Sequence, residues 1–181
     1  MAHAAVLIVG LGNPGKKYEF TRHNLGYRVA ERLRGELGLP PFTKKEPLLA
    51  EVSEGEVNGT HVTLARPLTF MNESGHAVAR LKARAKVATG KVWIIHDDKD
   101  LESGVIKVKD NGGSAGHHGV DSVMEQLKTK SFRRYRLGVL PSSGIEGETD
   151  KFVLAKFLPE EEPTVRLQVD KATTKIVDDL K

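Results

Sequence analysis

The sequence contains no cysteine among its 181 residues. Disulfide bonds, thiolate metal sites and a cysteine nucleophile are therefore excluded, and the composition is compatible with a reducing compartment. Long apolar runs are lacking too, because the run over residues 4–9 stops at Gly10, too early for a signal sequence or a membrane span. We interpret this run as a first buried strand and expect no association with membranes.

Neither sign of charge dominates the chain, whose formal net charge is +4 with 39% hydrophobic and 29% charged residues. These values are ordinary for a globular protein, and the length fits one domain, so we expect residues 1–181 to form a single domain. Basic residues are nevertheless concentrated in one segment, where they suit a phosphate backbone, although a solvated face is the commoner meaning of such a run. They are Lys107, Lys109, Lys128, Lys130, Arg133, Arg134 and Arg136.

Strand and helix patterns alternate along the chain without an internal repeat. Apolar residues recur every four positions from Leu25 to Leu37, which predicts an amphipathic helix, and Asn58-Gly59 predicts a hairpin between the strands on either side. Further strands are predicted over 92–95, 105–109 and 135–139, and further helices over 74–84, 120–127 and 165–180.

This order of elements predicts an α/β fold in which a mixed, mostly parallel sheet is sandwiched between helices. The loops over residues 10–24, 96–104 and 110–119 each follow a predicted strand. Because ligands bind at the carboxyl ends of strands in such sheets, we expect these three loops to meet at one rim.

Two nucleotide-binding patterns almost match the loop that starts at Gly10. Gly10-Leu11-Gly12-Asn13-Pro14-Gly15 satisfies GxGxxG, but no acidic residue ends a second strand about 20 residues on. The same stretch lacks the metal-binding hydroxyl of a P-loop, because Lys17 stands where Ser or Thr is required. A tight glycine turn that carries the chain off the sheet is the better interpretation.

A third pattern, Gly112-Gly113-Ser114-Ala115-Gly116, matches the GxSxG nucleophile elbow. In that fold an acid and then a histidine follow the serine. Here the last histidines are His117 and His118, with no acid between them and Ser114. A serine triad of that class is therefore not expected.

Four separated segments together resemble the bacterial peptidyl-tRNA hydrolase family. In order, they are GLGNPGKKYEFTRHN (10–24), PLTFMNESG (67–75), HDDKDL (96–101) and KVKDNGGSAGHHG (107–119). The resemblance extends over about residues 6–157, and agreement of four motifs is far more specific than any one of them. It implies hydrolysis of the ester between a peptide, or an N-blocked amino acid, and the 3′-terminal ribose of tRNA, which recycles tRNA from prematurely released peptidyl-tRNA.

Ester hydrolysis needs a base with a pKa near neutrality, a partner that orients it and donors for the developing oxyanion. The resemblance assigns His23 as the base that activates water and Asp97 as its partner. Alone, His23 would be an incidental loop histidine, and only the resemblance selects Asp97 over Asp98 and Asp100.

The resemblance also implies substrate-binding and tRNA-binding residues. Asn13 and Asn72 would hold the substrate near the ester, since one amide offers donors and an acceptor. Asn72 could instead cap a helix, and Phe70 and Met71 could instead be core. The implied lining of the peptide cleft is Tyr18, Phe70 and Met71, and the implied contacts to tRNA phosphates are Lys107, Lys109 and Arg136.

Two features depart from the family pattern. His118 stands where the family usually has asparagine, so an amide thought to hold the substrate becomes an imidazole, with added sensitivity to pH. The segment over residues 142–150 is acidic, with Glu146, Glu148 and Asp150, where relatives often have basic or apolar residues.

Two alternatives remain open at this point. A relative that only binds RNA would explain His118 and the acidic segment. A metal-dependent phosphoesterase is suggested by the density of ligand residues, namely His96, Asp97, Asp98, Asp100 and His117, although adjacent carboxylates usually point apart. For the hydrolase we expect no cofactor, no metal and no obligate protein partner, a cytoplasmic monomer, and peptidyl-tRNA bound through its acceptor stem and 3′ end.

Overall fold

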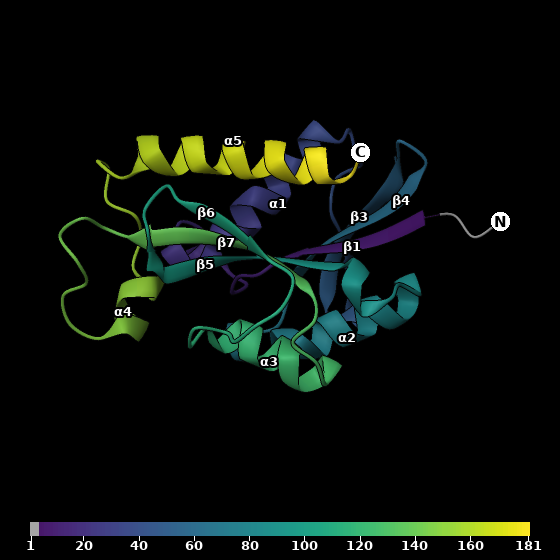
Figure 1. Ribbon diagram of the computed structural model, residues 1–181, viewed down its shortest axis with the longest axis horizontal. Coiled ribbons are helices and arrows are strands. Elements are labelled where there is room, and N and C mark those ends of the chain that lie inside the picture. Colours follow the sequence, from purple (N-terminus) through teal and green to yellow (C-terminus); the bar gives the residue numbers. More distant parts are fainter. Residues whose placement is uncertain (1–3) are drawn as a thin grey trace.

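One sheet of seven strands forms the centre of the computed structural model, which describes residues 4–181 (Figure 1). The strands lie in the order β2-β3-β4-β1-β5-β7-β6. Their bounds are β1 (Ala4–Gly10), β2 (Thr43–Lys45), β3 (Ala50–Val57), β4 (Thr60–Pro67), β5 (Val92–Glu102), β6 (Ile106–Lys109) and β7 (Arg133–Leu140). The helices are α1 (Leu25–Glu36), α2 (Ser74–Ala85), α3 (His118–Leu127), α4 (Thr149–Leu154) and α5 (Glu162–Asp179).

Parallel pairing joins the four central strands, since β1 pairs with β4 and β5, and β5 pairs with β7. Antiparallel pairing adds β3 and β2 at one edge and β6 at the other. The predicted α/β fold with a mixed sheet is confirmed, and the hairpin at Asn58-Gly59 joins β3 to β4.

Helices cover both faces of the sheet, with α1 and α5 on one side and α2 and α3 on the other (Figure 1). Alternate residues of β1 serve the two layers. Val6 and Ile8 pack with α1 and α5, whereas Leu7 and Val9 pack with α2 and α3. Burial on both faces explains why β1 is continuously apolar rather than alternating.

The glycines after β1 allow the chain to pass close to α1. A Cβ at Gly10 would clash with the carbonyl oxygen of Gly26, and a Cβ at Gly12 would lie 2.6 Å from the ring of Tyr27. The GxGxxG spacing therefore serves close packing between a strand and a helix, in agreement with the predicted tight turn.

Three local features differ from the sequence-based expectation. The segment 96–104 is not a loop, because β5 continues to Glu102 before turning into β6. β2 and α4 were not predicted, since three and six residues are too short for a periodic pattern to emerge.

Within residues 4–181, no helix is both long and apolar enough to cross a membrane.

Candidate active site

His23 lies where the loop after β1 becomes α1. It sits in a 3₁₀ turn, Arg22–Asn24, that leads directly into the helix. Asp97 lies on β5, which is hydrogen-bonded to β1, so the carboxyl ends of these parallel strands bring the two side chains together. Of the three segments expected to meet at one rim, 10–24 and 96–104 meet here, and 110–119 joins them through His117.

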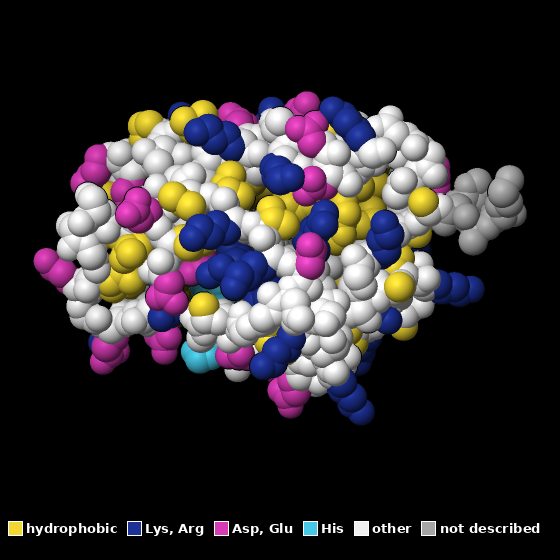
Figure 2. Space-filling model, viewed as in Figure 1, with side chains coloured by type: hydrophobic (Ala, Val, Ile, Leu, Met, Phe, Trp, Pro, Cys, Tyr) yellow, Lys and Arg dark blue, Asp and Glu magenta, His cyan; other side chains and the backbone are white. Residues whose placement is uncertain are grey.

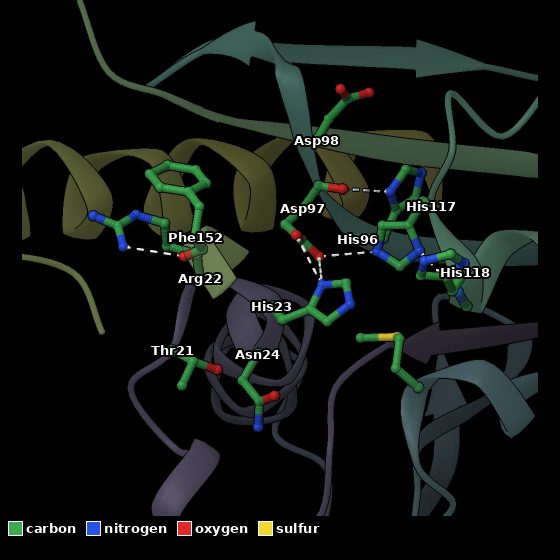
Figure 3. A network of polar contacts seen from close by, with 12 residues as sticks. Thr21, Arg22, His23, Asn24, His96, Asp97, Asp98, His117, His118 and Phe152 are labelled. Atoms are coloured by element: carbon green, nitrogen blue, oxygen red, sulfur yellow. Dashed lines mark hydrogen bonds and ion pairs between the residues drawn. The ribbon is translucent and has the colours of Figure 1, made fainter. Parts of the chain in front are cut away.

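Asp97 holds one nitrogen of His23 and leaves the other free. His23 Nδ1 lies 2.9 Å from Asp97 Oδ2 and 3.0 Å from Oδ1, and both side chains are buried (Figure 3). Donation from Nδ1 to a carboxylate fixes the tautomer with the lone pair on Nε2. His23 also borders the open cleft, so this geometry suits Nε2 to accept a proton from water.

His117 is a second partner of Asp97, and the sequence did not reveal it. Its Nδ1 accepts hydrogen bonds from the backbone N–H groups of Gly119 and Val120 at the start of α3, at 3.1 and 3.2 Å. The ring proton must therefore sit on Nε2, which donates to Asp97 Oδ1 at 2.9 Å. The adjacent histidines of the G-H-H-G segment could have indicated a second histidine at the site, but only His118 was assigned a role in the hydrolase from the sequence.

These contacts perturb the acid and the base in opposite senses. Burial alone would raise the pKa of Asp97, but its electrostatic interactions and hydrogen bonds with His23 and His117 hold that pKa well below its ordinary value. Burial alone would lower the pKa of His23, yet attraction to Asp97 and the hydrogen bond to it raise that pKa above 6.5. An ionised Asp97 is therefore placed to stabilise a positive charge on the His23 ring.

Only one of the three histidines around Asp97 can act as the base. His96 is enclosed, its Nδ1 donates to the backbone oxygen of Asp97 at 2.7 Å, and burial together with His117 lowers its pKa to about 3. Both nitrogens of His117 are occupied. Of these three histidines, His23 is the one that borders the cleft with a ring nitrogen that is not hydrogen-bonded by any residue in 4–181.

Asn13 is fixed beside His23 by a second asparagine. The side chain of Asn24 accepts from the backbone N–H of Asn13 at 2.8 Å and donates to its backbone oxygen at 2.9 Å. Asn13 Oδ1 in turn accepts from the backbone N–H of Met71 at 2.7 Å. With that oxygen engaged, the Nδ2 group of Asn13 is what remains to donate to a substrate, which narrows the role expected from the sequence.

All six residues expected to bind substrate border the same cleft as His23. Asp150, Val153 and Leu154 of α4, which the sequence did not suggest, complete its wall. Phe70 is 54% exposed, whereas Met71 is both buried in the core beside α2 and α3 and part of the lining. The six are Asn13, Tyr18, Phe70, Met71, Asn72 and His118.

Asn72 is exposed and does not cap a helix. The residue at the N-terminal cap of α2 is Glu73, and that cap has no side-chain hydrogen bond. The competing structural role considered for Asn72 is therefore not observed, and its amide is available at the edge of the cleft.

The two departures from the family pattern lie against each other. His118 Nε2 at the start of α3 is 3.7 Å from Asp150 Oδ1 in the first turn of α4, with both side chains largely exposed. Both also border the cleft. The sequence identifies each of these two departures from the family pattern, but it does not show that they are in contact.

The three residues expected at tRNA phosphates occupy neighbouring positions on β6 and β7. Lys107 and Lys109 are exposed, and Lys107 is in register with Arg136. Arg136 differs from the lysines because its guanidinium pairs with Asp98, with Nε and Nη2 each 2.8 Å from Oδ2. Lys and Arg side chains gather around this part of the surface, over β5 to β7 (Figure 2).

Asp97 and Asp98 project in different directions from β5 (Figure 3). The five residues of the metal-dependent alternative therefore do not form one site. Asp98 pairs with Arg136, and His96 is hydrogen-bonded to the backbone oxygen of Asp97. Within residues 4–181, the one group offering three ligand atoms within 4.8 Å of one another is His23, Asp97 and His117. Those atoms are already joined by hydrogen bonds.

The fold is of the α/β class, and its site places a carboxylate-oriented histidine at the carboxyl ends of parallel strands, an arrangement that suits a hydrolytic enzyme. The comparisons with known proteins agree, since the peptidyl-tRNA hydrolase family model matches residues 7–180. The chain belongs to the peptidyl-tRNA hydrolase family.

Individual relatives match over nearly the whole chain. It is 40% identical over 172 residues to the peptidyl-tRNA hydrolase of Listeria welshimeri, covering 95% of this chain and 91% of that protein. It is 42% identical over 176 residues to that of Mycobacterium tuberculosis, covering 96% and 91%. The crystal structure of the Acinetobacter baumannii peptidyl-tRNA hydrolase matches with a TM-score of 0.87 and 31% identity, covering 97% and 89%.

Proposed function

We propose that this protein hydrolyses the ester bond between a peptide, or an N-blocked amino acid, and the 3′-terminal ribose of tRNA. The observation that carries the proposal is the bond from His23 Nδ1 to Asp97 at 2.9 Å, which leaves Nε2 free at a cleft bordered by asparagines. Membership of the peptidyl-tRNA hydrolase family supports the choice of substrate.

In the proposed reaction, His23 Nε2 takes a proton from water as the water oxygen bonds to the ester carbonyl carbon. The charge that develops on the carbonyl oxygen needs donors, which the amides of Asn13 and Asn72, in the same cleft as His23, would supply. When the tetrahedral intermediate collapses, the carbon–oxygen bond to the ribose breaks and the imidazolium returns its proton to the ribose oxygen. The products are a carboxylic acid, which releases its proton to solvent at neutral pH, and tRNA with a free hydroxyl.

The peptide next to the ester would lie between Tyr18, Phe70 and Met71 on one side and α4 on the other. The exposed aromatic ring of Phe70 offers apolar contact that does not depend on peptide sequence. His118 would bond the substrate in place of the family's asparagine, because a neutral imidazole can donate or accept one hydrogen bond.

Lys107 and Lys109 would contact phosphates of the acceptor stem near the 3′ end of tRNA. Contacts of that kind are independent of base sequence, which suits an enzyme that must accept many tRNAs. Arg136 would contribute positive charge at the same surface while its guanidinium remains paired with Asp98. We also propose that the protein acts as a monomer in the cytoplasm, where its substrate arises during translation.

The decisive assay is incubation with N-acetyl-aminoacyl-tRNA in EDTA, followed by separation of released N-acetyl-amino acid from intact tRNA ester. We expect multiple turnovers per protein molecule without added metal. Turnover that requires a divalent cation would overturn the metal-independent mechanism. Tight binding of tRNA without release would identify the protein as an RNA-binding relative instead.

A further inference from the structure

Arg22 is the residue next to the proposed base, yet its side chain does not enter the cleft. We propose that Arg22 is a positioning residue that ties the loop carrying His23 to α4, the opposite wall of the cleft. The inference rests on the proposed function, and it assigns to Arg22 control of the geometry of the substrate cleft.

The guanidinium of Arg22 is bound at the end of α4. Its Nη1 donates to the backbone oxygen of Phe152 at 3.3 Å (Figure 3) and to that of Lys156 at 3.1 Å. Its Nη2 lies 2.7 Å from Glu161 Oε2. Arg22 is 5% exposed. The last carbonyls of a helix lack partners within the helix and carry partial negative charge, so a buried cation is well placed there.

Aromatic rings and backbone bonds complete this junction. The guanidinium carbon lies 4.2 Å from the ring centre of Phe152 and 5.4 Å from that of Phe157. The backbone N–H of Arg22 donates to the oxygen of Ala155 at 3.1 Å, and Thr21 and Lys156 form an antiparallel bridge beside it. The turn that carries His23 and the end of α4 therefore form one packed unit.

The position of α4 decides the shape of the cleft. Asp150, Val153 and Leu154 of this helix line the cleft that also contains His23. The helix has only six residues, too few to be stable in isolation, so its position depends on tertiary contacts. Arg22 supplies several such contacts at once, from the residue adjacent to the proposed base.

Lysine cannot reproduce this arrangement, because an ammonium group has no planar fork to bind a carboxylate and several carbonyls while stacking on a ring. We therefore expect Arg22→Lys to remain charged while releasing α4. A displaced wall should raise KM for N-acetyl-aminoacyl-tRNA by about tenfold to a hundredfold, with kcat changed less. A loss of folded protein alone would lower the apparent kcat and leave KM unchanged.

Arg28 provides a matched control. It lies in α1, two turns beyond Arg22, and its guanidinium pairs with Glu162 at 2.9 Å and approaches the same Phe157 ring. Its hydrogen bonds reach α5 rather than α4. Arg28→Lys should therefore remove a comparable ion-pair geometry while leaving KM within about twofold of the wild-type value.

A disulfide gives a rescue test in this cysteine-free chain. Thr21 and Lys156 are bridge partners, and residues paired in antiparallel strands lie within the Cα separation that disulfides accept. In the Arg22→Lys background, oxidised Thr21→Cys/Lys156→Cys should restore a low KM, and reduction should raise it again. The double cysteine variant with Arg22 retained reports any effect of the cysteines themselves.

Amide hydrogen exchange over residues 149–156 gives a readout that needs no substrate. We expect exchange there to be faster in Arg22→Lys than in wild type or Arg28→Lys, and to slow again with the oxidised disulfide. No turnover by wild type would overturn the proposed function, while this exchange measurement still tests the tie to α4. Unchanged exchange in Arg22→Lys, or unchanged KM alongside normal wild-type turnover, would overturn the role of Arg22.

Discussion

His117 Nε2 lies 2.9 Å from Asp97 Oδ1, the same oxygen that accepts from His23 Nδ1 at 3.0 Å. One buried carboxylate oxygen is thus shared by two imidazoles. Asp97 is held in a single orientation, and His23 is held by it in turn.

The first prediction concerns this shared oxygen. His117→Phe removes the donor to Asp97 and the acceptor at the start of α3, so the carboxylate should orient His23 less well. We expect kcat for N-acetyl-aminoacyl-tRNA to fall, by up to about a hundredfold. His117→Gln can still donate an N–H and should retain more activity than His117→Phe. Equal kcat values for all three proteins would show that His117 does not act through Asp97.

A second prediction uses pH. His23 must be neutral to accept a proton, so kcat should decline as the pH falls through its pKa, which Asp97 raises above 6.5. Asp97→Asn removes the negative charge but leaves the burial that lowers the pKa of His23. The acidic decline of kcat should therefore move to lower pH, while the plateau falls by about 10² to 10⁴-fold. A decline that stays at the wild-type pH would contradict the assignment.

The third prediction concerns the contact between His118 and Asp150 at the edge of the cleft. The His118 ring can bond the substrate or stay turned toward the Asp150 carboxylate, so their contact competes with substrate between α3 and α4. We expect Asp150→Asn to lower KM for N-acetyl-aminoacyl-tRNA and His118→Ala to raise it, with kcat changed less in both variants. Equal KM values for wild type and both variants would remove His118 from the account.

A fourth prediction separates the basic residues of β6 and β7. Lys107→Gln should raise KM and reduce the dependence of log KM on log salt concentration, because one phosphate contact is lost, with thermal stability unchanged. Lys171→Gln, at an exposed position of α5, should do neither. Arg136→Gln should also lower the free energy of unfolding, by about 3 kcal/mol, since Asp98 would lose its partner while buried. If Lys107→Gln leaves the dependence of log KM on log salt concentration unchanged, tRNA does not bind at Lys107.

Much of this architecture could be predicted from the sequence, because periodicity and turn residues report local structure directly. The stripe from Leu25 and the Asn58-Gly59 turn fall in α1 and in the β3–β4 hairpin. The extension of β5 to Glu102 was missed because its second half is charged and resembles a loop. Yet that extension is what sends Asp97 and Asp98 to different partners.

The site was predictable as a set of residues but not as a network. Motifs could gather His23, Asp97 and Asn13 at one rim, and all three are found there. Contacts made by residues to which the motifs assign no role could not be found in this way. The second bond of Asp97, from His117, and the contact of Arg22 with α4 both depend on tertiary distances that sequence spacing does not encode.

The most direct test of the account is the release of N-acetyl-amino acid from N-acetyl-aminoacyl-tRNA by wild type, His23→Ala and His76→Ala, measured at pH 8. His76 is an exposed histidine of α2 and serves as the matched control. We expect His23→Ala to reduce kcat by about 10² to 10⁴-fold while His76→Ala matches wild type. Release by His23→Ala at the wild-type rate would contradict the claim that His23 activates water.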